Sequence, residues 1–260
     1  MLWNNFYLFA IVAMLLSAVG AALAWRPRSK RCWSTVLTLG AIAVLVSFVG
    51  ALWFSLQRPP LRTMGETRLW YSLFSIIVGL IIYRHWHFRW ILSFTTVLSA
   101  VFCIINIIHP ELHDRSMMPA LQSAWFVPHV AVYMLAYAIM GCAVITAVAS
   151  LIKQQTALLH TTDNLIYIGV ALITFGILSG AVWAKQAWGD YWSWDPKETW
   201  AAITWAIYMI YIHIRQTHAS WHKTACLLVI IGFLGLQMCW YGFSYLSTSQ
   251  QSVHSYSQIQ

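Results

Sequence analysis

Aromatic and charged side chains are concentrated between residues 188 and 200, in the order Trp-Gly-Asp-Tyr-Trp-Ser-Trp-Asp-Pro-Lys-Glu-Thr-Trp. Buried tryptophans usually occur singly, because each indole N–H needs a hydrogen-bond partner. A group as dense as this one, with charges between the rings, predicts an aromatic platform for a flat ligand. The candidate binding residues of this platform are Trp188, Gly189, Trp192, Trp194 and Asp195.

The second half of this segment also has the sequence of a helix start. Asp195 is a suitable N-cap, Pro196 suits the first helical position, and Glu198 stands where a capping box requires an acidic residue. A purely structural role in capping is therefore an alternative for Asp195 and Glu198.

The composition is that of a membrane protein. Hydrophobic residues make up 60% of the chain and charged residues 8%, and the mean hydropathy is +0.66, which excludes a soluble domain. The net charge of +8 comes from scattered basic residues, a pattern typical of loops between spans. We therefore expect the lipid bilayer as a partner, and no nucleic acid.

Continuous apolar runs near the spanning length of about 20 residues predict an all-α, polytopic protein, because lipid admits only helices and closed barrels. We expect one membrane-embedded domain over residues 1–260, with about eight transmembrane helices. The predicted spans are 4–24, 35–56, 69–83, 90–108, 128–152, 164–184, 198–215 and 222–242.

Loop charges predict the orientation of these spans. Nine of the 15 basic residues fall in one set of loops, and six fall in the opposite set together with most of the acidic residues. The positive-inside rule assigns the first set to the cytoplasm. Both termini and the tryptophan-rich loop are therefore predicted to be extracytoplasmic.

Two histidines are then predicted on the same side as the tryptophan-rich loop. His129 follows Pro128 at the outer end of the fifth span, and His254 lies in the polar tail after the last span. Two imidazoles could supply both axial positions of a haem iron. The alternative is an ordinary helix-end histidine and an ordinary tail histidine.

His213 is predicted near the inner end of the seventh span. It follows Pro196 by 17 residues, which a rise of 1.5 Å per residue converts to about 26 Å. An ionisable side chain within a span is a functional candidate. An interface histidine grouped with Arg215 and His218 is the alternative.

The sequence Trp-Gly-x-x-Trp-x-Trp-Asp at 188–195, followed by Glu198, resembles the WWD motif of haem-handling proteins of cytochrome c maturation. Arg58-Pro-Pro-Leu with Glu66, residues 119–125 before His129, and the segment around His254 resemble further parts of this group. Eight predicted spans favour the CcsA/ResC family over CcmC, for which fewer helices are expected, and over the much longer CcmF.

The resemblance implies a subunit of a System II cytochrome c synthase in the cytoplasmic membrane. Haem b would cross the membrane and be held outside by His129 and His254, the implied catalytic iron ligands, against the WWD motif. Its vinyl groups would there form thioether bonds with the Cys-x-x-Cys-His motif of apocytochrome c. His213 would ligate iron at an inner haem site, which a CcsB/ResB-type partner would complete.

Some assignments stay open at this point. The haem propionates need cationic or polar partners, and the sequence offers Lys185, Lys197, Arg58 and Arg62 without choosing among them. Two other functions are possible: a haem carrier or exporter of the CcmC type without synthase activity, and a scaffold that uses the tryptophan-rich loop to dock a protein.

Overall fold

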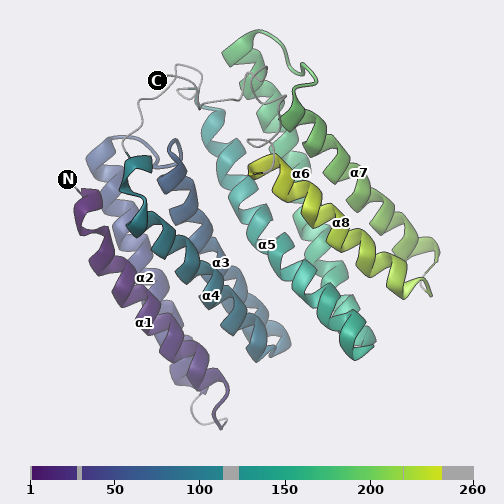
Figure 1. Cartoon of the computed structure of the whole chain (residues 1–260), viewed down its shortest axis with the longest axis horizontal. Helices are drawn as coiled ribbons and strands as arrows, with labels where there is room; N and C mark the ends of the chain where they lie inside the picture. Colours follow the sequence, from purple (N-terminus) through teal and green to yellow (C-terminus); the bar gives the residue numbers. More distant parts are fainter. Residues whose placement is uncertain (1, 28–30, 114–122, 219, 242–260) are drawn as a thin grey trace. The chain divides into compact units, whose positions relative to one another are not determined.

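The computed structural model describes residues 2–27, 31–113, 123–218 and 220–241 (Figure 1). These residues form helices and connecting loops, with no strand among them, which confirms the predicted all-α class. Contacts divide the chain into two compact units, Met1–Gln122 and Ser123–Gln260, and each is described by itself. The sequence predicts one domain over residues 1–260. That the two units act as one domain stays a prediction.

Unit 1 contains four long helices that pack through apolar side chains. α1 packs against α2 and α4, and α3 packs against α4 and α2. Phe6, Phe48 and Leu69 lie in the buried core that these helices share. The elements are η1 (Leu2–Asn5), α1 (Phe6–Ala24), α2 (Arg31–Leu56), α3 (Met64–Trp86), α4 (Arg89–Ile108) and η3 (Pro110–Leu112).

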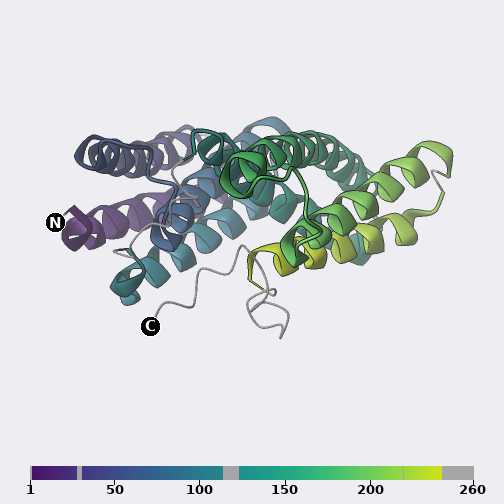
Figure 2. The ribbon, with the colours of Figure 1, turned by 90° about the horizontal axis from the view of Figure 1, so that it is seen from above.

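Unit 2 contains α5 (Phe126–Lys153), α6 (Thr156–Trp188), α7 (Pro196–Thr217) and α8 (His222–Trp240). α5 packs along α6 and α8, and α7 packs along α8 and contacts α6; Figure 2 shows α7 in green beside α8 in yellow. α5 and α7 begin, and α6 and α8 end, at the same end of the unit (Figure 1). We call this the tryptophan end, because residues 188–195 lie there.

Seven of the described helical segments are long and apolar enough to span a membrane, so the chain is a multi-pass membrane protein. α7 forms where the seventh span, 198–215, is predicted, but it is outside this set. Its sequence is less apolar because Lys197, Glu198, His213 and Arg215 interrupt the hydrophobic residues.

Local sequence explains where two of the helices begin. At α3, the Thr63 side chain accepts a hydrogen bond from the Glu66 N–H, and the Glu66 carboxylate accepts one from the Thr63 N–H. At α7, Asp195 and Glu198 form the predicted capping box, with Pro196 at the helix start. These reciprocal bonds satisfy N–H groups that have no partner within the helix.

Candidate functional site

His129 lies in the first turn of α5 at the tryptophan end, and its ring packs on α6. Its Nδ1 atom is 2.8 Å from the carbonyl oxygen of Gly176. The indole of Trp183 lies beside the imidazole at a centroid distance of 5.4 Å, and the ring of Tyr133 contacts it edge-on at 4.9 Å. The side chain is thus oriented by contacts from both helices.

The absence of a side chain at Gly180 makes room for this imidazole. A Cβ atom at residue 180 would lie 2.6 Å from both Cε1 and Nδ1 of His129. Gly176, one turn earlier in α6, likewise makes room for the ring of Tyr133. A Cβ atom at residue 176 would lie 2.8 Å from the nearest atom of that ring. The two glycines together form a shallow niche in α6 that accepts the aromatic side chains of α5.

The bond to Gly176 determines the chemistry of His129. A carbonyl oxygen can only accept, so Nδ1 must carry the proton and donate it. In the neutral imidazole the lone pair is then on Nε2, the tautomer that binds a metal. A ligand histidine that donates its other N–H to a backbone carbonyl is the usual arrangement around protein-bound metals.

The tryptophan-rich loop turns sharply at two positions with positive φ. Gly189 ends α6 with φ of 97° in the left-handed region, and Trp194 has φ of 57°. Glycine adopts such a conformation without steric cost, whereas a bulky side chain does so only where its surroundings hold it. Trp194 is therefore strained, and its side chain is 70% exposed.

The acidic residues of the motif hold this loop against α7. The Glu198 carboxylate accepts hydrogen bonds from the backbone N–H of Ser193 at 2.8 Å and of Asp195 at 3.1 Å. Asp195, which is 7% exposed, accepts a bond from the N–H of Lys197 at 2.9 Å. The predicted capping box of Asp195 and Glu198 is thus confirmed, while the predicted binding role of Asp195 stays a prediction.

The rings of the loop form two groups, of which Trp188 joins the aromatic side chains around His129. Trp188 contacts Trp183 edge-on at 4.8 Å, and Trp192 contacts Trp194 edge-on at 5.7 Å. The Nε1 atom of Trp192 is buried and has no hydrogen-bond partner among the described residues. A buried N–H donor without an acceptor is costly, and a polar group of a bound ligand would satisfy it.

Two of the predicted cations lie at the tryptophan end. Lys185 donates a hydrogen bond of 2.6 Å to the carbonyl of Gly189, and its Nζ lies 5.4 Å from the centre of the Tyr191 ring. Lys197 precedes the predicted span; burial lowers the pKa of its ammonium group, and the carboxylate of Asp195 raises it in part.

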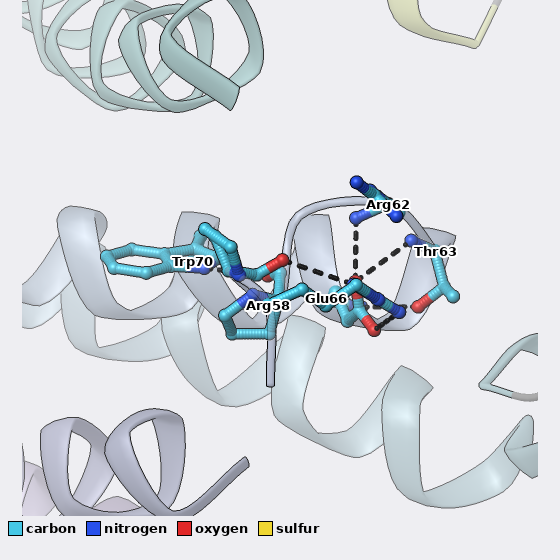
Figure 3. A network of polar contacts seen from close by, with 7 residues as sticks. Arg58, Arg62, Thr63, Glu66 and Trp70 are labelled. Carbon is cyan, nitrogen blue, oxygen red and sulfur yellow. Dashed lines mark hydrogen bonds and ion pairs between the residues drawn. The ribbon is translucent and has the colours of Figure 1, made fainter. Parts of the chain in front are cut away.

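The other two predicted cations belong to unit 1. Arg58 donates to both oxygens of Glu66, at 3.0 and 2.9 Å, and Glu66 is 1% exposed (Figure 3). The backbone N–H of Arg62 donates to the same carboxylate at 2.6 Å, while the pKa of the Arg62 guanidinium is lowered by burial and by Arg58. Trp70 donates to the carbonyl of Pro60 at 2.8 Å, which secures this loop.

His213 lies on α7, about 26 Å along the helix from Pro196 at a rise of 1.5 Å per residue. Its side chain is exposed. Tyr211 and Arg215 point the other way and bind Asp163 of α6, with a Tyr211 Oη distance of 2.6 Å and an Arg215 Nε distance of 2.8 Å. His213 is therefore separated from the Arg215 side chain with which it could have been grouped. His254, the second predicted outer ligand, lies outside the described residues.

Known proteins resemble this chain in sequence and in fold. The sequence pattern of the family described as cytochrome c assembly protein matches residues 61–250, from the loop before α3 to beyond α8. The chain belongs to this family. Membership gives it a role in cytochrome c maturation.

Curated relatives named cytochrome c biogenesis protein CcsA place it in the CcsA branch of the family. The protein of Pelargonium hortorum is 31% identical, over 85% of this chain and 86% of the relative. That of Mesostigma viride is 31% identical, over 84% and 85%, and that of Trachelium caeruleum is 28% identical, over 83% and 82%.

A solved structure named cytochrome c heme lyase CcmF has the same fold. It superposes with a TM-score of 0.71 at 18% identity, covering 92% of this chain and 46% of CcmF. The chain thus spans about half the length of that protein.

Sequence reasoning missed three residues that orient His129, namely Gly176, Gly180 and Trp183. The signal for the glycines is their spacing of four residues, which puts both on one face of a helix. No local pattern indicates which helix contacts that face, so the partner of the imidazole could not be inferred.

Proposed function

We propose that this CcsA-family protein is a subunit of a System II cytochrome c synthase, which moves haem b across the cytoplasmic membrane and presents it to apocytochrome c. The observation that carries the proposal is the geometry of His129. Its Nδ1 donates to Gly176, which leaves Nε2 as the ligand atom, and its ring adjoins an indole surface suited to a flat porphyrin.

In this proposal His129 and His254 bind the haem iron on the extracytoplasmic side. Trp188, Trp192 and Trp194 cover the macrocycle, and Gly189 and Asp195 set the path of the loop that carries these rings. His213 contributes to an inner haem site, and its exposure on α7 suits a site completed by a CcsB/ResB-type partner.

The bond-forming step requires positioning more than acid–base catalysis. Each cysteine thiol of the Cys-x-x-Cys-His motif adds across one vinyl double bond: a C–S bond forms and the thiol hydrogen goes to the other vinyl carbon. The addition consumes no oxidant or reductant. Holding the vinyl groups and thiols in reacting geometry can supply much of the acceleration.

Covalent attachment separates this proposal from the alternatives. Membranes that contain this chain, a CcsB/ResB-type partner and an apocytochrome c should give a cytochrome whose haem remains attached after denaturation. His129→Ala should abolish the product, and added imidazole should restore it by occupying the vacated iron position.

Three results would contradict the proposal. Haem bound by the chain but never attached to apocytochrome would favour the carrier function, and normal attachment by His129→Ala would exclude His129 as an essential ligand. A chain that binds no haem but still binds a protein partner would be a scaffold.

A further inference from the structure

A cavity of about 650 Å³ opens at the end of unit 2 opposite the tryptophan end. α5 ends and α8 begins there (Figure 1). The cavity is lined by Leu151 and Gln154 at the end of α5 and by residues 220–224, which lead into α8. Its volume lies in the range of about 300–1,000 Å³ that is typical of ligand sites. It is separate from the WWD motif and from His129, which lie at the tryptophan end.

The cavity lies at the level of the lipid headgroups. α5 and α8 are both apolar enough to span a membrane. α8 contains 19 residues, which corresponds to a length of about 28 Å and so to the thickness of the hydrocarbon core, about 30 Å. Its first residues therefore stand where the chain enters the bilayer. Trp221, directly before α8, is 50% exposed, which is typical of a tryptophan at the membrane–water interface.

The polar groups of the cavity suit an anion. Lys223 lines it with an exposed side chain, and His222 lines it beside Lys223. Gln154 adds an amide that can donate hydrogen bonds. None of the described residues that line the cavity is acidic, so none of them neutralises the ammonium group of Lys223. Such a compact cation is a common partner of phosphate groups in proteins.

Hydrogen bonds hold the two walls of the cavity together. The Nε2 atom of His222 lies 3.2 Å from the hydroxyl oxygen of Ser150 in α5, and this hydroxyl donates to the carbonyl oxygen of Gln155 at 3.0 Å. Because a hydroxyl group has a single hydrogen, His222 is the donor to Ser150. The start of α8 is thereby tied to the end of α5, which gives the cavity fixed walls.

An exposed apolar row on α8 continues from the cavity. Leu227 and Ile231 follow Lys223 at intervals of four residues, and Leu234 comes three residues later, so the four side chains share one helix face. Leu227 is 52% exposed, Ile231 50% and Leu234 60%. An anionic headgroup joined to apolar acyl chains is complementary to a cation at the head of such a row.

We infer that this cavity binds the headgroup of an anionic phospholipid, with the phosphate beside Lys223 and an acyl chain along Leu227 and Ile231. Basic pockets between transmembrane helices bind anionic headgroups in this way. A soluble phosphate ester would satisfy Lys223 but would leave the apolar row uncovered. The inference goes beyond the proposed function and does not rest on it, because the cavity lies at the end of unit 2 away from His129.

Lipid titration of the full chain, purified in a neutral detergent and followed by native mass spectrometry, tests the inference. We expect the wild type to bind its first molecule of phosphatidylglycerol more tightly than phosphatidylcholine with the same acyl chains. Lys223→Gln should reduce the affinity for phosphatidylglycerol about fivefold, the value of one basic side chain at an anionic membrane surface. The affinity for phosphatidylcholine should not change. Lys223→Arg, which keeps the charge, should keep the preference.

Lys153→Gln is the matched control. Lys153 lies at the same end of unit 2 and is exposed, but it does not line the cavity. This variant should bind phosphatidylglycerol like the wild type. Equal losses of affinity for Lys153→Gln and Lys223→Gln would reduce the effect to general surface charge and would overturn the inference.

Two further results would also overturn it. A wild type that binds phosphatidylglycerol and phosphatidylcholine equally would have no site for an anionic headgroup. Glycerol 3-phosphate has the phosphate group but no acyl chain, and it should bind far more weakly than phosphatidylglycerol. Equal or tighter binding of glycerol 3-phosphate would assign the cavity to a soluble anion.

Discussion

The Nδ1 atom of His129 and the carbonyl oxygen of Gly176 lie 2.8 Å apart and join the first turn of α5 to the middle of α6. The imidazole is therefore oriented by two packed helices and not by a loop. A ligand held in this way keeps its geometry before the substrate binds, which is what a precise metal site requires.

Gly180→Ala should remove this orientation without unfolding the protein. The added Cβ would lie 2.6 Å from the imidazole and would displace it, although alanine itself favours the helix. We expect haem affinity, measured by absorbance titration, to fall about 10- to 100-fold, as for other losses of support around a metal ligand. Gly50→Ala is the control, because a Cβ there meets nothing within 4 Å; equal affinities for the two variants would contradict the account.

Glu66→Gln should destabilise unit 1 strongly. The substitution removes the partner of Arg58 and weakens the capping box of α3, and breaking a buried ion pair costs about 3–5 kcal/mol. Denaturant unfolding in detergent measures the loss. Glu111→Gln, at an exposed position in η3, should unfold like the wild type, and the prediction fails if the two variants are equally stable.

Asp163→Asn should loosen the contact between α6 and α7. The carboxylate binds Arg215 through both oxygens and also accepts from Tyr211, so its loss removes the carboxylate from a buried ion pair at a cost of about 3–5 kcal/mol. Combining Asp163→Asn with Arg215→Met should cost less than the sum of the single changes. Strict additivity in this cycle would show that the two residues do not interact.

Trp194→Gly should give a more stable protein than Trp194→Ala. Both variants lack the indole, but only glycine accepts φ of 57° freely, and we expect a difference of about 1 kcal/mol in the free energy of unfolding. Both should weaken haem binding equally, because the exposed ring is lost in each. Lower stability for the glycine variant would mean that Trp194 carries no backbone strain.

The features of the fold that depend on neighbouring residues could be predicted from the sequence. Continuous apolar runs located the eight α-helices of the described residues. Asp195, Pro196 and Glu198 located the start of α7, because a cap is formed by residues next to one another. The start of α6 was less accessible. The predicted span begins at 164, where the continuous apolar run starts, whereas the helix begins at Thr156 and includes Asp163, whose partner Arg215 is distant in sequence.

In the candidate site, too, residue types could be predicted from the sequence, whereas tertiary contacts could not. The WWD motif and His129 could be recognised as a pattern of residue types, but the acceptor of the imidazole N–H is a backbone carbonyl, which no residue type encodes. The side-chain partners of Arg58 and Arg68 could not be inferred from the sequence. Only the fold shows that Arg58 meets Glu66, while two nitrogens of Arg68 have no partner among the described residues.

The central claim is that His129 ligates the haem iron, and the visible absorption spectrum of the reduced protein, purified with the proposed CcsB/ResB-type partner, tests it most directly. The wild type should show six-coordinate haem. His129→Gly should lose that spectrum, and added imidazole should restore it by filling the space left by the side chain. An unchanged six-coordinate spectrum in His129→Gly without imidazole would contradict the claim.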